Sequence, residues 1–456
     1  MTIKELYKLY QEHPCITTDS RDCPEGSIFL ALKGETFDGN KFAMTALEKG
    51  CSYAIVDEIS EELRVKSEEF ATALHYNPII KVSDTLQTFK DLAREHRRQF
   101  NIPVIGITGT NGKTTTKELI AAVLSQKYNV LYTQGNFNND VGVPKTLFRL
   151  TKDHEIAVIE MGASHPGDIK TLAETAEPTC GLITNVGRAH LQGFGSFEGV
   201  IKTKCELYNF LRTRQDSLIF INADNEYLMD QIADDEEIWL TPYSTDPENQ
   251  YACISGEIIA CDPFLKFRWR EPLMTLEEEG RSTKWHKVQT KLIGAYNIDN
   301  LLAAIAVGIN FGVDRKKICA ALEEYTPSNN RSQMTVTEKN HLIVDAYNAN
   351  PTSMHAALDN FSLIQADRKM AILGQMGELG EESDKEHRML VDRLESSGYD
   401  DVWLVGDNFR DIPCPFRKFH DVEEVKAAIR EQCPEGYYIL IKGSNSNKLF
   451  QLPELL

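Results

Sequence analysis

The sequence contains no run of about 20 apolar residues, the length that a helix needs to cross a bilayer. Its first five residues, 1–5, include one lysine and one glutamate and lack the apolar core of a secretory signal peptide. We therefore expect a cytoplasmic protein that does not span a membrane.

An excess of basic residues is also missing. The formal net charge is −19, from 49 Lys and Arg against 68 Asp and Glu. Binding along nucleic acid requires clustered Lys and Arg to neutralise phosphates, so we expect no nucleic-acid partner. A small anionic ligand is still possible, because a few backbone N–H groups and one lysine are enough to hold a phosphate.

The ten cysteines show neither a Cys-x-x-Cys pair nor the spacing of a zinc site. In a chain of 456 residues, this scatter indicates reduced thiols rather than a disulfide framework. Low-complexity tracts are absent, and a composition of 42% hydrophobic and 26% charged residues is typical of a globular protein.

The length predicts more than one core, and the apolar pattern predicts three α/β domains. We expect a small N-terminal α/β domain over 1–98, with a helical pattern at 83–100 near its end. Residues 99–326 repeat strand, loop and helix, which indicates a parallel sheet, and the stretch 254–288 predicts added antiparallel strands. A Rossmann-like C-terminal domain is expected over 327–456.

A strand, a glycine loop and a helix follow one another from Val104, in the run Val-Ile-Gly-Ile-Thr-Gly-Thr-Asn-Gly-Lys-Thr-Thr. Glycines let backbone N–H groups approach phosphate closely, and the helix N-terminus adds positive potential. We expect Lys113 to reach the β- and γ-phosphates of ATP and the Thr114 hydroxyl to bind Mg²⁺. The predicted ATP loop consists of Gly109, Thr110, Asn111, Gly112, Lys113, Thr114 and Thr115.

The loop departs from the usual Walker pattern, because Ile107 stands where the first glycine is expected. A chance glycine turn that enters a helix is the alternative. The guanine signature of GTPases and the motifs of protein kinases are absent. The loop thus predicts phosphate binding in a central P-loop domain without naming a reaction.

Further blocks along the chain resemble the Mur ligases, which join an amine to a carboxylate through an acyl phosphate. The blocks occur in the family's order. They are Thr18-Asp-Ser-Arg, Leu32-Lys-Gly-Glu-Thr-Phe-Asp-Gly, the phosphate loop, Gly135-Asn-Phe-Asn-Asn-Asp-Val-Gly-Val-Pro, Glu160-Met-Gly-Ala, Asn185-Val-Gly-Arg-Ala-His-Leu, Gly294-Ala-Tyr-Asn-Ile-Asp-Asn, Asp345-Ala-Tyr-Asn-Ala-Asn-Pro and Lys442-Gly-Ser. Within the family they are most similar to the type that adds D-alanyl-D-alanine to UDP-N-acetylmuramoyl-tripeptide (UDP-MurNAc-tripeptide) in peptidoglycan precursor synthesis.

The resemblance implies a catalytic set around two Mg²⁺ ions: Lys113, Glu160, His190 and Lys204. Glu160 ends an apolar strand, and hard cations prefer carboxylate oxygen, although a strand-end acid commonly faces water. His190 is implied as a ligand of the second ion, a role that rests on the resemblance because imidazole is not a preferred ligand of Mg²⁺.

Lys204 reads from sequence alone as a lysine on a helix surface. In the family the matching lysine is carbamylated by CO₂, which turns a cation into an anion that can bind the second Mg²⁺. Lys202 is the competing candidate, and the spacing to Tyr208 favours Lys204. The implied metal ligands are Thr114, Glu160, His190 and carbamylated Lys204.

The resemblance also implies further ATP contacts. Asn297 and Asn300 are expected near adenine, since amides supply both a donor and an acceptor, although helix capping is the simpler interpretation. Arg331 and Asp345 are implied in holding phosphates and ribose by closure of the third domain, while a linker arginine is the alternative for Arg331.

Ser20 and Arg21 match the block that binds the UDP portion in the family, and arginine can pair with a diphosphate in a bidentate manner. Asn138 and Asn139 are implied in the groove for the muramoyl peptide. Tyr347, Asn348 and Asn350 are expected to face the incoming dipeptide or the γ-phosphate, and the protein is expected to be a monomer.

Three alternatives remain. A Mur-type ligase that adds a single amino acid is the nearest, although the Asp-Asn-Pro-Arg-like block of ligases for the third residue is missing. The second is a P-loop NTPase switch that binds partners and forms no product, but such a switch would not need the implied metal ligands beside the loop. The third is a descendant of the ligases that binds its ligands without catalysing a reaction. Departures from the family at Asn40, Gln375 and 445–447 concern substrate contacts rather than ATP chemistry.

Overall fold

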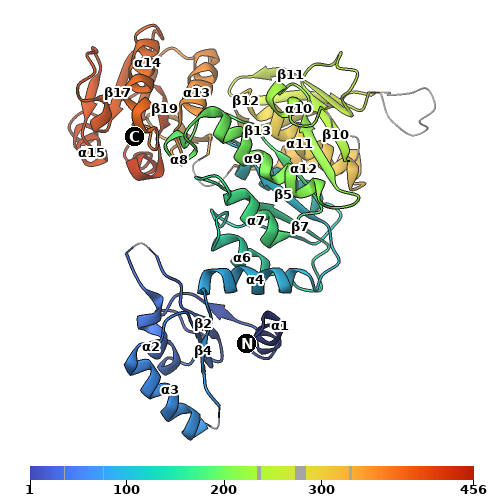
Figure 1. The fold of residues 1–456 in the computed structure, drawn as a ribbon. Helices are drawn as coiled ribbons and strands as arrows, with labels where there is room; N and C mark the ends of the chain where they lie inside the picture. The colour runs from blue at the N-terminus through green and yellow to red at the C-terminus, as the bar shows by residue number, and fades with distance from the viewer. Residues whose placement is uncertain (35, 75, 234–237, 273–283, 328–330) are drawn as a thin grey trace. The chain divides into compact units, whose positions relative to one another are not determined.

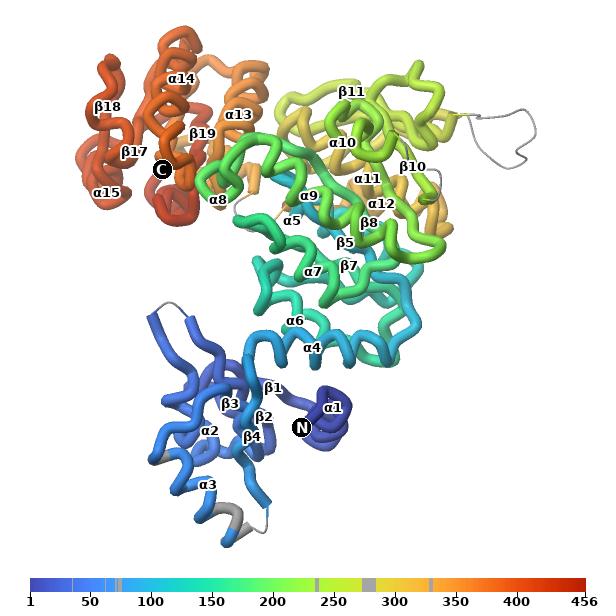
Figure 2. Tube along the Cα trace, viewed as in Figure 1, coloured from blue at the N-terminus to red at the C-terminus, as the bar shows by residue number. Residues whose placement is uncertain are grey.

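The computed structural model describes residues 1–34, 36–74, 76–233, 238–272, 284–327 and 331–456 (Figures 1 and 2). These residues form two compact units. The first unit consists of residues 1–102, 136–154 and 171–177, and the second of 103–135, 155–170 and 178–456.

The first unit contains a four-stranded parallel sheet in the order β1-β2-β3-β4. Its strands are β1 (Ile16–Thr17), β2 (Ile28–Leu30), β3 (Tyr53–Val56) and β4 (Ile79–Lys81). Its helices are α1 (Ile3–Glu12), η1 (Gly39–Phe42), α2 (Ala43–Glu48), α3 (Glu61–Leu74), α4 (Thr85–Arg97) and α6 (Gly142–Leu147). The helical pattern expected at 83–100 is confirmed by α4, which Asp84 caps by accepting from the backbone N–H of Gln87.

The second unit begins with a nine-stranded sheet in the order β13-β12-β11-β10-β9-β8-β5-β7-β6. The strands from β6 to β11 pair in parallel, and β11, β12 and β13 pair antiparallel, which confirms the predicted parallel sheet with an antiparallel addition. The strands are β5 (Val104–Thr108), β6 (Val130–Tyr132), β7 (Ile156–Glu160), β8 (Cys180–Ile183), β9 (Leu218–Asn222), β10 (Trp239–Ser244), β11 (Ile254–Cys261), β12 (Phe264–Arg270) and β13 (His286–Ile293).

Helices cover both faces of this sheet. Ile105 and Ile107 pack into a core with α5, α11 and α12, while Gly106 between them faces Leu207 of α9. This alternation is what a strand buried on both faces requires. The helices of this unit are α5 (Lys113–Leu124), α8 (Leu191–Phe194), α9 (Phe197–Arg212), α10 (Glu226–Asp230), α11 (Asn297–Asn310) and α12 (Arg315–Glu324). Helix α7 (Asp168–Ala176) begins in this unit, and its residues from 171 onward belong to the first.

A six-stranded sheet completes the second unit, in the order β14-β15-β19-β16-β17-β18. All its pairs are parallel except β14 with β15. One core packs α13 and α14 on the sheet, and another packs α15 and the last residues on the opposite face, as in a Rossmann-like domain. The elements are β14 (Gln333–Val336), β15 (His341–Asp345), α13 (Pro351–Leu363), β16 (Lys369–Gly374), η2 (Gly380–Glu382), α14 (Ser383–Glu395), β17 (Asp401–Val405), η3 (Asp407–Phe409), β18 (Arg417–Phe419), α15 (Val422–Glu431), β19 (Tyr438–Lys442), η4 (Asn445–Asn447) and η5 (Leu449–Gln451).

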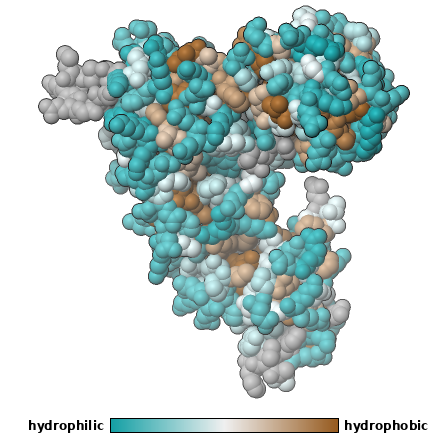
Figure 3. Space-filling model, turned by 180° about the vertical axis from the view of Figure 1, so that it is seen from behind, coloured by the Kyte–Doolittle hydropathy of each residue, from teal (hydrophilic) through white to brown (hydrophobic). Residues whose placement is uncertain are grey.

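The surface carries many polar and charged residues, as the 26% of charged residues in the sequence leads one to expect. The face drawn in Figure 3 is mainly hydrophilic, with small hydrophobic areas between. In the parts of the chain that are described, no helix has both the length and the apolar character of a membrane span. All ten cysteines are free thiols in the structure.

The close packing of α9 on the sheet makes a first prediction. Gly106 and Gly181 pair across β5 and β8, and a Cβ at Gly181 would lie 2.7 Å from the Gly106 carbonyl oxygen and 3.2 Å from Leu207. Gly181→Ala should therefore lower the free energy of unfolding by about 1–3 kcal/mol, as overpacking does. Urea unfolding followed by circular dichroism measures the change.

The matched control is Gly377→Ala, because a Cβ at Gly377 meets no atom within 4 Å. Equal stability of the two variants would contradict the close packing of α9 on β5 and β8.

Candidate active site

The phosphate loop connects β5 to α5 in a conformation that requires glycine at two positions. Gly109 has φ 142°, and a Cβ there would lie 2.0 Å from the Thr184 hydroxyl oxygen. Gly112 has φ 79° and directly precedes α5, whose first residue is Lys113. Both φ values lie in the range that favours glycine, so the loop brings the helix N-terminus to the end of β5.

The segment after β8 holds this loop in place. The Thr110 N–H donates to the Asn185 carbonyl oxygen at 2.9 Å. The Asn111 N–H donates to Asn185 Oδ1 at 3.0 Å, and the Asn111 carbonyl accepts from Thr184 Oγ1 at 2.6 Å and from Asn185 Nδ2 at 3.1 Å. The block Asn185-Val-Gly thus orients the phosphate loop.

Lys113 folds back over the loop. Its Nζ donates to the carbonyl oxygens of Gly109 at 2.8 Å and Thr110 at 3.0 Å. Burial lowers the pKa of Lys113 to about 8; Glu160 opposes this shift, and Arg331 adds to it. An ammonium group so poorly compensated is well placed to bind an anion.

Glu160 ends β7 and is buried, with 1% of its surface exposed. The Thr114 hydroxyl donates to Glu160 Oε1 at 3.1 Å. This pair fits a hard cation, because Mg²⁺ takes oxygen ligands and keeps other positions for phosphate and water. The described residues contain no group of three His, Cys, Asp or Glu side chains that could hold a metal ion.

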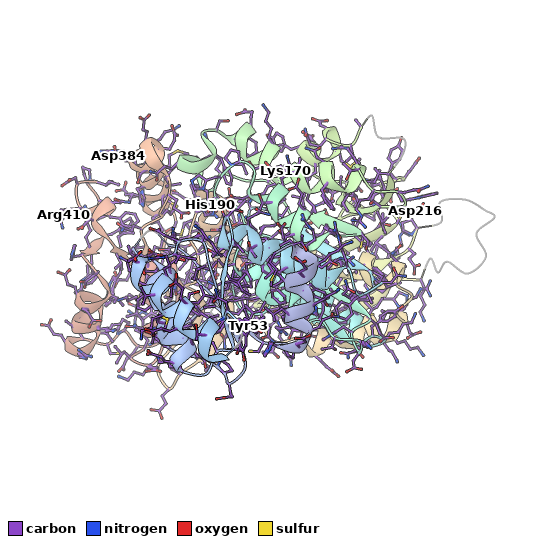
Figure 4. The ribbon with its side chains drawn as sticks, turned by 60° about the horizontal axis from the view of Figure 1, so that its bottom comes forward. Tyr53, Lys170, His190, Asp216, Asp384 and Arg410 are labelled. Atoms are coloured by element: carbon purple, nitrogen blue, oxygen red, sulfur yellow. The ribbon has the colours of Figure 1, made fainter. Side chains whose placement is uncertain are left out.

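His190, labelled in Figure 4, directly precedes α8 and has φ 51°. Its Nδ1 lies beside Glu378 Oε2, and the two form an ion pair when the imidazole is protonated. Burial lowers the pKa of His190; the Glu378 charge raises it, and Lys113 and Lys204 lower it further. The charges of both lysines therefore act on His190, and its role as a metal ligand stays a prediction.

Lys204 lies on α9 and is 2% exposed, so the expectation of a surface lysine is wrong. Its Nζ lies 5.2 Å from the centroid of the Phe194 ring. Burial lowers the pKa of Lys204 to about 7; Lys113 lowers it further, while Asp168 and Glu206 raise it. Lys202 on the same helix is exposed, which favours Lys204 as the functional lysine.

Asn297 and Asn300 are buried in a network that joins α11 to α5. Asn297 Nδ2 donates to the Ile293 carbonyl at 2.8 Å, and its Oδ1 accepts from Asn300 Nδ2 at 2.9 Å. Asn300 Oδ1 accepts from the Thr116 hydroxyl at 2.9 Å. Neither residue is the N-cap of α11, which is Tyr296, and contact of either amide with adenine stays a prediction.

Arg331 and Asp345 occupy the start of the third domain. The Arg331 guanidinium carbon lies 3.8 Å from the centroid of the Tyr347 ring. Asp345, at the end of β15, accepts from the buried Lys442 ammonium at 2.6 Å. Of the two, Arg331 influences the phosphate loop, because its positive charge lowers the pKa of Lys113.

Of the residues expected on the dipeptide side, Asn350 touches the phosphate loop. Its Nδ2 donates to Asn111 Oδ1 at 2.9 Å, and its Oδ1 caps α13 by accepting from the Ser353 N–H at 2.8 Å. The Asn348 carbonyl accepts from Lys442 at 3.2 Å. Asn350 therefore contacts the phosphate loop directly.

A cavity of about 310 Å³ lies at the carboxyl ends of β16 and β17, and the sequence did not reveal it. Carboxyl ends of parallel strands are a common location for ligand sites. Tyr347, Asn348 and Asn350 are not among its lining residues. These are Gln375, Val405, Gly406, Asp407, His420, Asp421, Val422, Glu423, Ser446, Asn447 and Lys448.

The residues expected to bind the UDP substrate lie in the first unit. The Arg21 guanidinium pairs with Asp19, with Nη2 2.7 Å from Oδ2, and its side chain is 88% exposed. The Ser20 carbonyl accepts from Lys49 Nζ at 2.8 Å. Arginine paired with aspartate must exchange that partner to bind a diphosphate.

Asn138 and Asn139 belong to the loop before α6. Asn139 Oδ1 accepts from the Gly142 N–H at 2.8 Å, and the Asn138 N–H donates to the Asn136 carbonyl at 2.8 Å. The exposed Asn139 is thereby oriented by its own loop.

Three family models match the chain. They are described as Mur ligase family, catalytic domain (residues 14–97), Mur ligase middle domain (107–308) and Mur ligase, glutamate ligase domain (330–445).

Two relatives named UDP-N-acetylmuramoyl-tripeptide--D-alanyl-D-alanine ligase are 33% identical to this chain. The protein from Synechocystis sp. aligns over 94% of this chain and 89% of its own, and that from Escherichia coli over 94% and 91%. The crystal structure of MurF from Acinetobacter baumannii is similar with a TM-score of 0.84 and 27% identity, covering 98% of this chain and 97% of that one.

The fastening of the phosphate loop makes the second prediction. Asn185→Ala removes a side-chain acceptor and a side-chain donor from Asn111. Loss of about 1–1.5 kcal/mol of hydrogen bonding should raise the Kd of a non-hydrolysable ATP analogue roughly tenfold. Isothermal titration calorimetry measures it, with Asn209→Ala, an exposed residue of α9, as the control. An unchanged Kd would contradict the role of Asn185.

Proposed function

This chain belongs to the Mur ligase family, and we propose on that premise that it joins D-alanyl-D-alanine to UDP-MurNAc-tripeptide with consumption of ATP, in the synthesis of peptidoglycan precursors. The observation that carries the proposal is the similarity over nearly the whole chain to ligases named for this reaction. The phosphate loop and the Thr114–Glu160 pair supply the local chemistry that such a reaction needs. ATP and a nucleotide-linked substrate fit an enzyme of the cytoplasm.

The terminal carboxylate of the tripeptide attacks the γ-phosphorus of ATP, the bond to the β-phosphate oxygen breaks, and an acyl phosphate and ADP form. An anion must therefore approach an anion, and positive charge has to offset their repulsion. Lys113 exchanges the carbonyls of Gly109 and Thr110 for phosphate oxygens, and the N-terminus of α5 adds backbone N–H groups. The neutral amine of D-alanyl-D-alanine then attacks the activated carbonyl carbon and its nitrogen loses a proton, the C–O bond to phosphate breaks, and the amide and inorganic phosphate form.

Two Mg²⁺ ions belong to the proposal. Thr114 and Glu160 would hold one, and His190 and a carbamate on Lys204 the other. Bound Mg²⁺ neutralises phosphate charge and orients the transferring group. Pairing of Nδ1 with Glu378 favours Nε2 of His190 as the metal ligand, which is the usual arrangement of a carboxylate behind a ligating histidine.

Carbamylation of Lys204 is supported by its burial. The reaction needs a neutral amine: its nitrogen lone pair bonds to the carbon of CO₂, and the nitrogen then loses a proton. A pKa of about 7 leaves about half of the Lys204 side chains neutral at pH 7, against roughly one in 2,500 for an ordinary lysine. The resulting carbamate is negatively charged and would attract the Lys113 ammonium, whereas a protonated Lys204 repels it.

The other assignments are proposals of position. Asn297, Asn300, Arg331 and Asp345 would contact the adenosine and phosphates of ATP, with the support that Arg331 acts on Lys113 and that Asn300 lies beside Gly112. The UDP substrate would contact Ser20, Arg21, Asn138 and Asn139, and the dipeptide would approach Tyr347, Asn348 and Asn350. We propose a monomer, because one chain carries all these groups.

Product formation tests the proposed function. The protein is incubated with ATP, Mg²⁺, D-alanyl-D-alanine and UDP-MurNAc-tripeptides whose third residue is lysine or diaminopimelate, and the products are weighed by mass spectrometry. We expect addition of one dipeptide and release of one phosphate per product. ATP hydrolysis that needs neither substrate, or addition of a single amino acid, would contradict the proposal.

The carbamate makes the third prediction. Removing CO₂ from buffers and protein should lower kcat, and added bicarbonate should restore it. Because carbamylation requires the neutral amine, the loss should be larger at pH 6, where only about a tenth of Lys204 is neutral, than at pH 8. Lys204→Arg should lose roughly 100-fold or more in kcat at every CO₂ level. A kcat that does not respond to CO₂ would contradict the carbamate.

A further inference from the structure

Lys117 is a buried cation that the mechanism above does not use. It lies on α5 with 0% of its surface exposed and is one of the largest fully buried side chains among the described residues. A charge taken out of water is unfavourable unless opposite charges compensate it. Its Nζ lies 3.6 Å from Glu160 Oε2 and 3.8 Å from Glu118 Oε1.

The two oxygens of Glu160 therefore face different residues of one helix. Thr114 and Lys117 are three positions apart on α5, which places them on the same face. Thr114 Oγ1 donates to Oε1 at 3.1 Å, and the Lys117 ammonium lies beside Oε2. This arrangement determines which oxygen is turned toward the Thr114 hydroxyl.

Lys117 has a second acidic neighbour, Glu118, which is itself hydrogen-bonded. Glu118 Oε1 lies near the Lys117 ammonium, and Glu118 Oε2 accepts from the Tyr325 hydroxyl at 2.6 Å. The Tyr132 ring centroid lies 6.0 Å from Nζ. Two carboxylates and an aromatic ring thus lie near the ammonium, which forms no hydrogen bond among the described residues.

A buried ion pair that only stabilises the fold is the simpler interpretation. Such pairs contribute little to stability compared with apolar residues of similar size. Here the partner is the carboxylate that stands beside the Thr114 hydroxyl and the phosphate loop. A structural pair would not need that particular partner, so the location favours a function.

We propose that Lys117 is a positioning residue for the metal site: it retains Glu160 Oε2, so that Glu160 offers only Oε1 to the ion beside Thr114. The inference rests on the proposed metal role of Glu160. A carboxylate limited to one oxygen suits Mg²⁺, which demands near-octahedral geometry, whereas Ca²⁺ accepts bidentate carboxylates. Lys117 thus makes the site selective for the smaller ion.

Lys117→Met tests the proposal, because methionine keeps the length of the side chain and removes its charge. Affinities of Mg²⁺ and Ca²⁺ are measured by displacement of Mn²⁺ in the presence of ADP, with free Mn²⁺ followed by electron paramagnetic resonance. We expect Mg²⁺ affinity to fall roughly tenfold or more, as it does when groups behind a metal ligand are removed. Ca²⁺ affinity should fall less or rise, since both Glu160 oxygens become accessible.

Two further variants complete the test. Lys316→Met, at an exposed position of α12, should leave both affinities unchanged. Lys117→Gln, which keeps a polar N–H group near the end of the side chain, should show a smaller change in the ratio of the two affinities than Lys117→Met. Circular dichroism and Tm verify that each variant is folded.

Equal weakening of Mg²⁺ and Ca²⁺, or no weakening, in folded Lys117→Met would overturn the proposal. Loss of folding in both Lys117 variants would assign Lys117 to the fold and overturn it as well. The proposed function fails separately, if the unaltered protein forms no ligated product or does not bind Mg²⁺ with ADP.

Discussion

Buried positive charge at the phosphate loop is the constraint on which the rest of the site depends. Burial lowers the pKa of Lys113, His190 and Lys204. The charge of Lys113 lowers the pKa of Lys204 further, and the charges of both lysines lower that of His190. Glu160 is the acid that most strongly opposes this effect at Lys113. A bound polyphosphate would compensate this positive charge. The site therefore favours an anion, although the protein as a whole is acidic.

The scaffold explains how this charge stays in place. Gly109 and Gly112 allow the loop its backbone conformation, and Asn185 in the segment after β8 holds it by hydrogen bonds. On the other face of the sheet, Gly106 and Gly181 let α9 approach closely, which buries Lys204. Glycines therefore act in two ways here, by conformation in the loop and by lack of volume under the helix.

Local features could be read from the sequence, and long-range ones could not. The glycine loop, the start of α5 and the parallel sheet follow from neighbouring residues, and they agree with the structure. The burial of Lys204 depends on how α9 packs on β8, which no local pattern reveals. The partners of His190 and Asn111 come from Glu378 and Asn350, far along the chain.

Lys117 is an intermediate case, because its spacing from Thr114 places it on the same helix face and could have identified it. Its partner Glu160 became visible only in the structure. Asn297 and Asn300 show the reverse: the sequence selected them, and the structure adds that their amides already form a network with Thr116.

The ligation activity of Lys113→Ala tests the central claim most directly. Product is measured by mass spectrometry at saturating ATP and both substrates, after circular dichroism has shown that the variant is folded. If charge at this loop activates the carboxyl group, kcat should fall roughly 100- to 1,000-fold. Full ligation activity without the Lys113 ammonium would contradict the account.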